Sequence, residues 1–160
     1  MSTTLFSKYM LLAIQQAKKA LKNNEIPIGC ILVNRLNPEQ YFATCNTIQN
    51  SKNPIKHAEI NAINLANKTI KQKYLNNFDM YITLEPCHMC AYAISLTHIP
   101  NIYFGAYNHK TGALCNDYNI YSFKSCTFKP NYFGGIYESQ CQQLLDIFFT
   151  NKRNKKNKLT

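Results

Sequence analysis

The 160-residue sequence contains no run of about 18 apolar residues, the length that a membrane-spanning helix requires. Its N-terminal segment also lacks the basic region and the small-residue cleavage site of a secretory signal peptide. No internal repeat or low-complexity linker divides the chain. We therefore expect a cytoplasmic protein with a single domain over residues 1–160, of which about 151–160 form a basic tail.

Acidic residues are scarce, since 8 aspartates and glutamates stand against 18 lysines and arginines, and the formal net charge is +10. Five of the basic residues lie in the last nine positions: Lys152, Arg153, Lys155, Lys156 and Lys158. A positive field raises the rate of encounter with polyanions, so this charge indicates a nucleic-acid partner. A solvated tail that only aids solubility is the alternative.

Disulfides are not expected, although the chain has seven cysteines. Their number is odd and no secretion signal precedes them. Two of them form the spacing Cys87-x-x-Cys90, which occurs both in metal sites and in thioredoxin-like redox pairs. A histidine motif upstream favours the metal site.

That motif is His57-x-Glu59. Farther along the chain, Pro86 immediately precedes Cys87-x-x-Cys90. One imidazole and two thiolates make a three-ligand zinc set with an open fourth position, which is the arrangement of catalytic zinc sites. Glu59 stands close enough to His57 to exchange protons with water at the metal without being a ligand. The pattern is already known from zinc-dependent nucleobase deaminases. We predict one zinc ion per chain, held by His57, Cys87 and Cys90, with Glu59 as the catalytic proton shuttle.

Apolar periodicity predicts a three-layer α/β/α domain with a mixed central sheet. Helical spacing is present over about 4–22, 57–71, 87–97 and 138–154. Strands are expected at about 26–33, 41–45, 80–84, 102–107 and 127–129. The first two strands should form an antiparallel hairpin, whereas helices connect the later ones. Both halves of the zinc motif then lie at helix N-termini, whose positive end favours thiolates.

Beyond the zinc motif, the chain from about Glu25 to Ala113, and more loosely through its last helix, resembles the bacterial tRNA-specific adenosine deaminases. The matching segments include Pro27-Ile28-Gly29, Asn46, Asn53-Pro54, Thr83 to Cys87, Met89-Cys90-Ala91, Phe104-Gly105-Ala106 and Lys110 to Ala113. The resemblance implies a cytidine deaminase-like fold and hydrolysis of adenosine to inosine at the wobble position of a tRNA anticodon loop. It also implies a homodimer. It places Asn46, Ala58 and Asn108 at the substrate, where Asn46 would hydrogen-bond the flipped base.

Asn53 and Asn108 each stand where this family usually has aspartate, and the segment 114–116 replaces a run of smaller residues. An aspartate near the substrate backbone can accept a hydrogen bond from a 2′-hydroxyl, so Asn108 is expected to relax discrimination between RNA and DNA. For Asn108, as for Asn46, the alternative is a side chain that only shapes a turn.

Two other functions remain open from the residues alone. A deaminase of a free purine or pyrimidine base or nucleoside would share the metal site but would need no basic tail. A zinc-dependent RNA-binding protein without turnover would have no use for Glu59 as a proton shuttle. Zinc content with ammonia release separates the enzyme from the binding protein, and tRNA compared with free adenosine separates the two enzymes.

Overall fold

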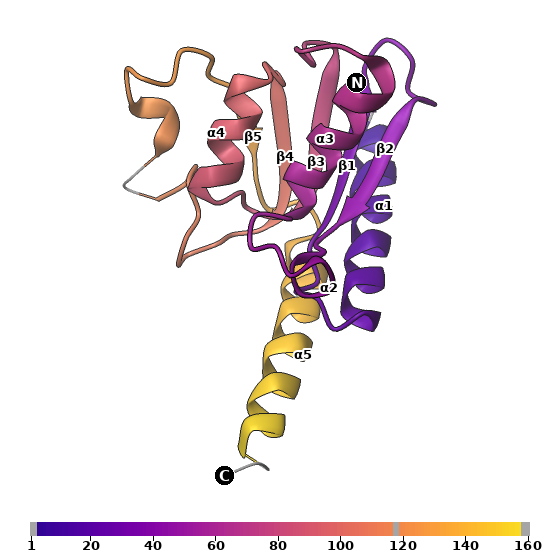
Figure 1. The fold of residues 1–160 in the computed structure, drawn as a ribbon, viewed down its shortest axis with the longest axis vertical. Helices are drawn as coiled ribbons and strands as arrows, with labels where there is room; N and C mark the ends of the chain where they lie inside the picture. The colour runs from indigo at the N-terminus through magenta and orange to yellow at the C-terminus, as the bar shows by residue number, and fades with distance from the viewer. Residues whose placement is uncertain (1–2, 117–118, 158–160) are drawn as a thin grey trace.

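The chain folds as a five-stranded sheet in the order β2-β1-β3-β4-β5, as seen in a computed structural model that describes residues 3–116 and 119–157. Its elements are α1 (Thr3–Lys22), β1 (Gly29–Asn34), β2 (Tyr41–Cys45), α2 (Ile48–Ser51), α3 (Ala58–Ile70), β3 (Phe78–Leu84), α4 (His88–Leu96), β4 (Asn101–Ala106), the 3-10 helix η1 (Ile120–Ser122), β5 (Asn131–Phe133) and α5 (Glu138–Asn157). Helices α3 and α4 lie in front of the sheet and α1 lies behind it (Figure 1), where α5 packs against α1 and β4. The predicted α/β/α layers are confirmed.

The strand directions place the ends of β3 and β4 at one edge of the sheet. Strand β1 pairs antiparallel with both β2 and β3, whereas β3–β4 and β4–β5 are parallel. The expected hairpin and mixed sheet are thus confirmed. Because β3 and β4 are parallel and Leu84 pairs with Ala106, the segments that follow them leave the sheet side by side. One of these segments contains Cys87 and the other contains Asn108.

Helix α1 packs closely on β1 because both surfaces carry small residues. Ala13 and Ala17 are fully buried on the face of α1 that meets the sheet. At Gly29, a Cβ would lie 2.0 Å from the Ala13 carbonyl oxygen and 2.5 Å from the Ala17 nitrogen, which no real side chain tolerates. The glycine of the Pro27-Ile28-Gly29 segment therefore serves this helix–strand contact.

Two predicted strands differ from the observed ones. Strand β1 begins at Gly29, because the Ile28 N–H donates to the Ile26 carbonyl 2.7 Å away and turns the chain at Pro27. The last strand covers Asn131–Phe133 and not 127–129, since pairing with β4 begins only after Pro130, which has no N–H to donate. Helix α5 continues to Asn157, three residues past the predicted end. No helix within the described ranges is long and apolar enough to cross a membrane.

Candidate active site

Two helix starts bring His57, Cys87 and Cys90 together. His57 immediately precedes α3 and Cys87 immediately precedes α4, both with extended backbone. The Nδ1 atom of His57 lies 3.5 Å from the Cys90 sulfur and 3.7 Å from the Cys87 sulfur. All three candidate ligand atoms lie within 4.8 Å of one another. In tetrahedral zinc sites, bond lengths of about 2.0 and 2.3 Å separate the nitrogen and sulfur ligands by about 3.5 Å. The donor set therefore fits a zinc ion.

Hydrogen bonds among the three side chains also shift their pKa values. Hydrogen bonds with Cys90 and His57 lower the pKa of Cys87 to about 4. The same bond with Cys87, together with burial, raises the pKa of Cys90. The pKa of His57 is raised, chiefly by its hydrogen bond with Cys87. A bound zinc ion would displace the protons of these hydrogen bonds, and both sulfurs would then bind it as thiolates.

Glu59 lies in the first turn of α3, and only 3% of the residue is exposed. Burial raises the pKa of its carboxyl group to about 7. Its Oε2 atom is buried and has no hydrogen-bond partner among the described residues. Buried polar atoms are normally paired, so this oxygen indicates a missing partner at the site. A water or a substrate atom beside the metal ligands would supply that partner.

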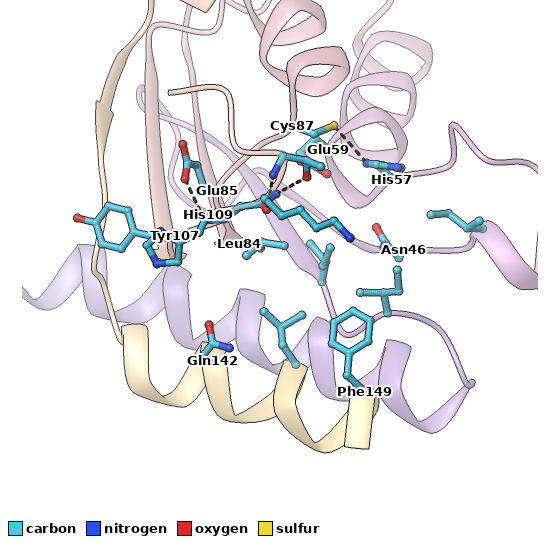
Figure 2. Close-up of a pocket in the computed structure, with 17 residues that line it drawn as sticks. Asn46, His57, Glu59, Leu84, Glu85, Cys87, Tyr107, His109, Gln142 and Phe149 are labelled. Carbon is cyan, nitrogen blue, oxygen red and sulfur yellow. Dashed lines mark hydrogen bonds between the residues drawn. The ribbon is translucent and has the colours of Figure 1, made fainter. Parts of the chain in front are cut away.

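These side chains form one wall of a cavity of about 430 Å³ (Figure 2), a volume in the range of small-molecule sites. Asn46, His57, Glu59 and Cys87 form the inner wall. On the opposite side, Gln142 and Phe149 extend from α5 toward the cavity. The segment 108–111 closes a third side. No local motif marks the residues of α5 that line the cavity, so their position there could not be predicted from the sequence.

Asn46 lines the cavity and is hydrogen-bonded to the first turn of α3, the helix that begins after His57 and contains Glu59. It is buried, and its Oδ1 accepts the N–H of Ala58 at 2.9 Å. This N–H is in the first turn of α3, where no intrahelical acceptor exists. Because the oxygen is used in this way, the amide NH₂ of Asn46 is the group available to a ligand. Ala58 itself is fully buried and contributes its backbone N–H to Asn46.

Asn108 lies at the cavity, but its side chain is bonded within its own loop. The Oδ1 atom accepts the Thr111 N–H at 3.0 Å, and Nδ2 donates to the Thr111 hydroxyl at 2.9 Å. Asn53 behaves alike, since its Oδ1 accepts the Ile55 N–H at 3.1 Å. An aspartate could accept the same main-chain hydrogen bonds. Both departures from the family pattern thus occupy loop-shaping positions.

Glu85 is a further residue of the site that sequence reasoning missed. It is 2% exposed and lines the cavity. Its Oε1 accepts the N–H groups of Leu114 and Cys115 at 3.0 and 2.8 Å, and its Oε2 accepts the N–H of Asn108 at 3.0 Å. Its position two residues before Cys87 was the available signal. The three donors lie more than twenty residues away along the chain, so no local pattern identifies them.

Comparison with known proteins places this site in a family. The family profile described as "Cytidine and deoxycytidylate deaminase zinc-binding region" matches residues 4–106. The tRNA-specific adenosine deaminase of Rickettsia typhi is 37% identical over 142 residues, which are 89% of this chain and 96% of the relative. That of Bacillus subtilis is 34% identical over 148 residues, covering 92% and 91% of the two chains.

Solved structures give the same picture. A structure from a study of A-to-I editing by tRNA:A34 deaminases at the wobble position of transfer RNA superposes with a TM-score of 0.82 and 34% identity. It covers 86% of this chain and 99% of its own. A guanine deaminase from Nitrosomonas europaea superposes with a TM-score of 0.75 at 16% identity, over 89% of this chain and 83% of its own. The second likeness concerns the fold alone.

Proposed function

The chain belongs to the family of tRNA-specific adenosine deaminases, and on that basis we propose that it hydrolyses adenosine to inosine at the wobble position of a tRNA anticodon loop. The proposal is carried by the cluster of His57, Cys87 and Cys90 beside Glu59, whose buried Oε2 atom has no partner among the described residues, at one cavity. The enzyme is zinc-dependent, and these three side chains are the proposed ligands. Because the proposed substrate is a tRNA, we propose that the reaction takes place in the cytoplasm.

Zinc at this site would acidify a water molecule. Glu59 accepts a proton from that water and delivers it to N1 of the adenine ring while the water oxygen bonds to C6. Glu59 then transfers the second water proton to the amine on C6, and the C6–N bond breaks. Ammonia leaves, and the water oxygen remains as the carbonyl of inosine. Each turnover consumes one water and leaves Glu59 in its starting state.

Asn46 is proposed to orient the base, because its amide NH₂ can donate to a ring acceptor while its oxygen stays bonded to Ala58. A base must leave its stack to enter a cavity of this kind. An anticodon loop presents unpaired bases, so most of the cost of unstacking a duplex is avoided. Asn108 contributes to this site by shaping the loop at the cavity mouth.

The basic end of the chain is proposed to contact the RNA backbone. Lys152, Arg153 and Lys155 lie exposed on the last turns of α5, which extend away from the sheet (Figure 1). The same helix lines the cavity with Gln142 and Phe149. An anticodon stem-loop whose reacting base occupies the cavity would thus bring phosphates alongside α5.

A homodimer is the proposed assembly, and α4 offers a surface for it. Met89, Tyr92 and Leu96 are exposed at helical spacing on this helix. Leu65 on the neighbouring α3 is exposed as well. Apolar side chains gathered in this way are typical of protein–protein contacts. Sedimentation of the purified protein, with Leu96→Glu for comparison, tests this assignment.

The decisive experiment incubates the zinc-loaded protein with a tRNA transcript that carries adenosine at the wobble position and measures inosine by mass spectrometry. Free adenosine, guanine and cytosine are tested in parallel at the same concentrations. We expect conversion of the tRNA and none of the small molecules. Release of ammonia from a free base or nucleoside with no reaction of the tRNA would replace the proposal with the small-molecule deaminase.

A further inference from the structure

We propose that Glu85 is a positioning residue for tRNA binding, whose buried carboxylate holds the loop 108–115 as the outer wall of the substrate cavity. This inference rests on the proposed function only for the identity of the substrate. One side chain at the end of β3 organises a loop that follows β4.

The carboxylate accepts only main-chain hydrogen bonds from this loop. Oε2 takes the N–H of Asn108 at its start, and Oε1 takes the N–H groups of Leu114 and Cys115 at its end. No ion pair with Glu85 is present within residues 3–116 and 119–157. The charge is therefore compensated by N–H dipoles, and hydrogen bonds to a charged acceptor are stronger than neutral ones. The carboxylate thus holds the two ends of the loop together.

Gly112 shows how closely the loop surrounds this group. A Cβ on Gly112 would lie 2.5 Å from the Oε2 atom of Glu85 and 2.5 Å from the carbonyl oxygen of Asn108. Because Gly112 has no side chain, there is space for the Glu85 carboxylate. No other residue type fits there without displacing the carboxylate or the backbone.

The far end of the loop has a second direct attachment, whereas the near end is bonded otherwise within the loop, where the Asn108 carbonyl accepts the Gly112 N–H at 2.8 Å. Gly112 forms an isolated bridge with Cys87, and the Ala113 N–H donates to the Pro86 carbonyl at 3.0 Å. These main-chain contacts tie the far end to the metal-binding segment. The near end carries His109 and Lys110 at the cavity mouth, and it is tied to the segment at Glu85 through the Asn108 N–H.

This asymmetry predicts a selective effect of Glu85→Gln. A carboxamide has one acceptor oxygen, which can still serve both Leu114 and Cys115. Its NH₂ group then faces the Asn108 N–H, and two donors oppose each other. The near end of the loop should loosen while the metal-binding segment keeps its contacts. Substrate binding should therefore weaken more than the chemical step.

The test compares wild type, Glu85→Gln and the exposed control Glu39→Gln. Amide hydrogen exchange is measured without substrate, and zinc content, KM and kcat are measured with the tRNA transcript. We expect Glu85→Gln to keep its zinc and to accelerate exchange at Asn108 by about 10-fold or more, the scale of one charged hydrogen bond. We also expect KM to rise about 10-fold with kcat changed less than about threefold. Glu39→Gln should match wild type.

Unchanged exchange at Asn108, or a fall in kcat with KM unchanged, would overturn the proposal. If Glu85→Gln does not fold, Glu85→Asp takes its place, because it keeps the charge but holds it farther from the loop. Its KM should lie above the wild-type value, and a wild-type KM would also overturn the proposal. If wild type itself leaves tRNA unreacted, the proposed function fails, whereas the exchange measurement still decides whether Glu85 holds the loop.

Discussion

The inner wall of the cavity is formed by His57, Glu59 and Cys87 at the starts of two helices, whereas the outer wall consists of the loop after β4 and of one side of α5. In the inner wall, a few residues of local spacing set each side chain, of which Glu59 is buried and His57 and Cys87 are half-buried. In the outer wall, long-range hydrogen bonds and helix packing set the shape. The chemistry is thus encoded locally, while substrate choice depends on how distant segments meet.

The largest effect is expected from removing a proposed metal ligand in the inner wall. Cys87→Ala removes one of three donors, so the protein should lose both zinc and inosine formation. Its melting temperature should fall as well, because a metal that binds the folded state stabilises it. Zinc content, turnover and thermal unfolding are measured beside Cys45→Ala, a cysteine outside the cluster. Retention of zinc and activity by Cys87→Ala would contradict the ligand assignment.

The next effect separates proton transfer from metal binding. Glu59→Gln keeps the shape of the side chain but cannot accept a proton, so turnover should fall by about 10²-fold or more while zinc stays bound. Single-turnover rates and zinc content check this together. Loss of zinc comparable to that of Cys87→Ala would make Glu59 a ligand and not a proton shuttle.

A smaller effect is expected at the basic end of α5, which lies beyond the outer wall. Lys152→Gln with Lys155→Gln removes two exposed charges, so the slope of log affinity for tRNA against log salt should flatten by about 1 to 2. Turnover at saturating tRNA should not change. The matched control is Lys68→Gln with Lys73→Gln, two exposed lysines beyond the cavity lining. A slope equal to that of wild type would identify the basic run as a solvated tail.

The smallest effect is expected at Asn108. An aspartate can keep the hydrogen bond from the Thr111 N–H, so Asn108→Asp should change the ratio of RNA to DNA deamination by about twofold or less. The measurement uses matched RNA and DNA hairpins with the same loop sequence. A change of tenfold or more would support the competing hypothesis, in which this position discriminates through the 2′-hydroxyl.

The same division explains what could be predicted from the sequence. Helical spacing predicted α3 and α4, and the zinc motif then placed His57 and Cys87 at their starts, because all of this depends on neighbours along the chain. The three donors to Glu85 and the approach of Phe149 to the cavity arise from packing between distant segments. The last strand was predicted at 127–129, too early in the chain, for a similar reason, since the three residues of β5 are set by pairing with β4 and carry little periodicity of their own.

Helix α5 has one further consequence, because a single rigid element carries both a cavity side chain and the basic end. Leu145 lines the cavity and Lys155 lies ten residues later on the same helix, a rise of about 15 Å. The contact of α5 with β4 holds this helix on the sheet. The helix therefore fixes the distance along its axis between the cavity lining and the basic end. A substrate that contacts both regions must therefore extend beyond the cavity, because Lys155 is not part of the cavity lining.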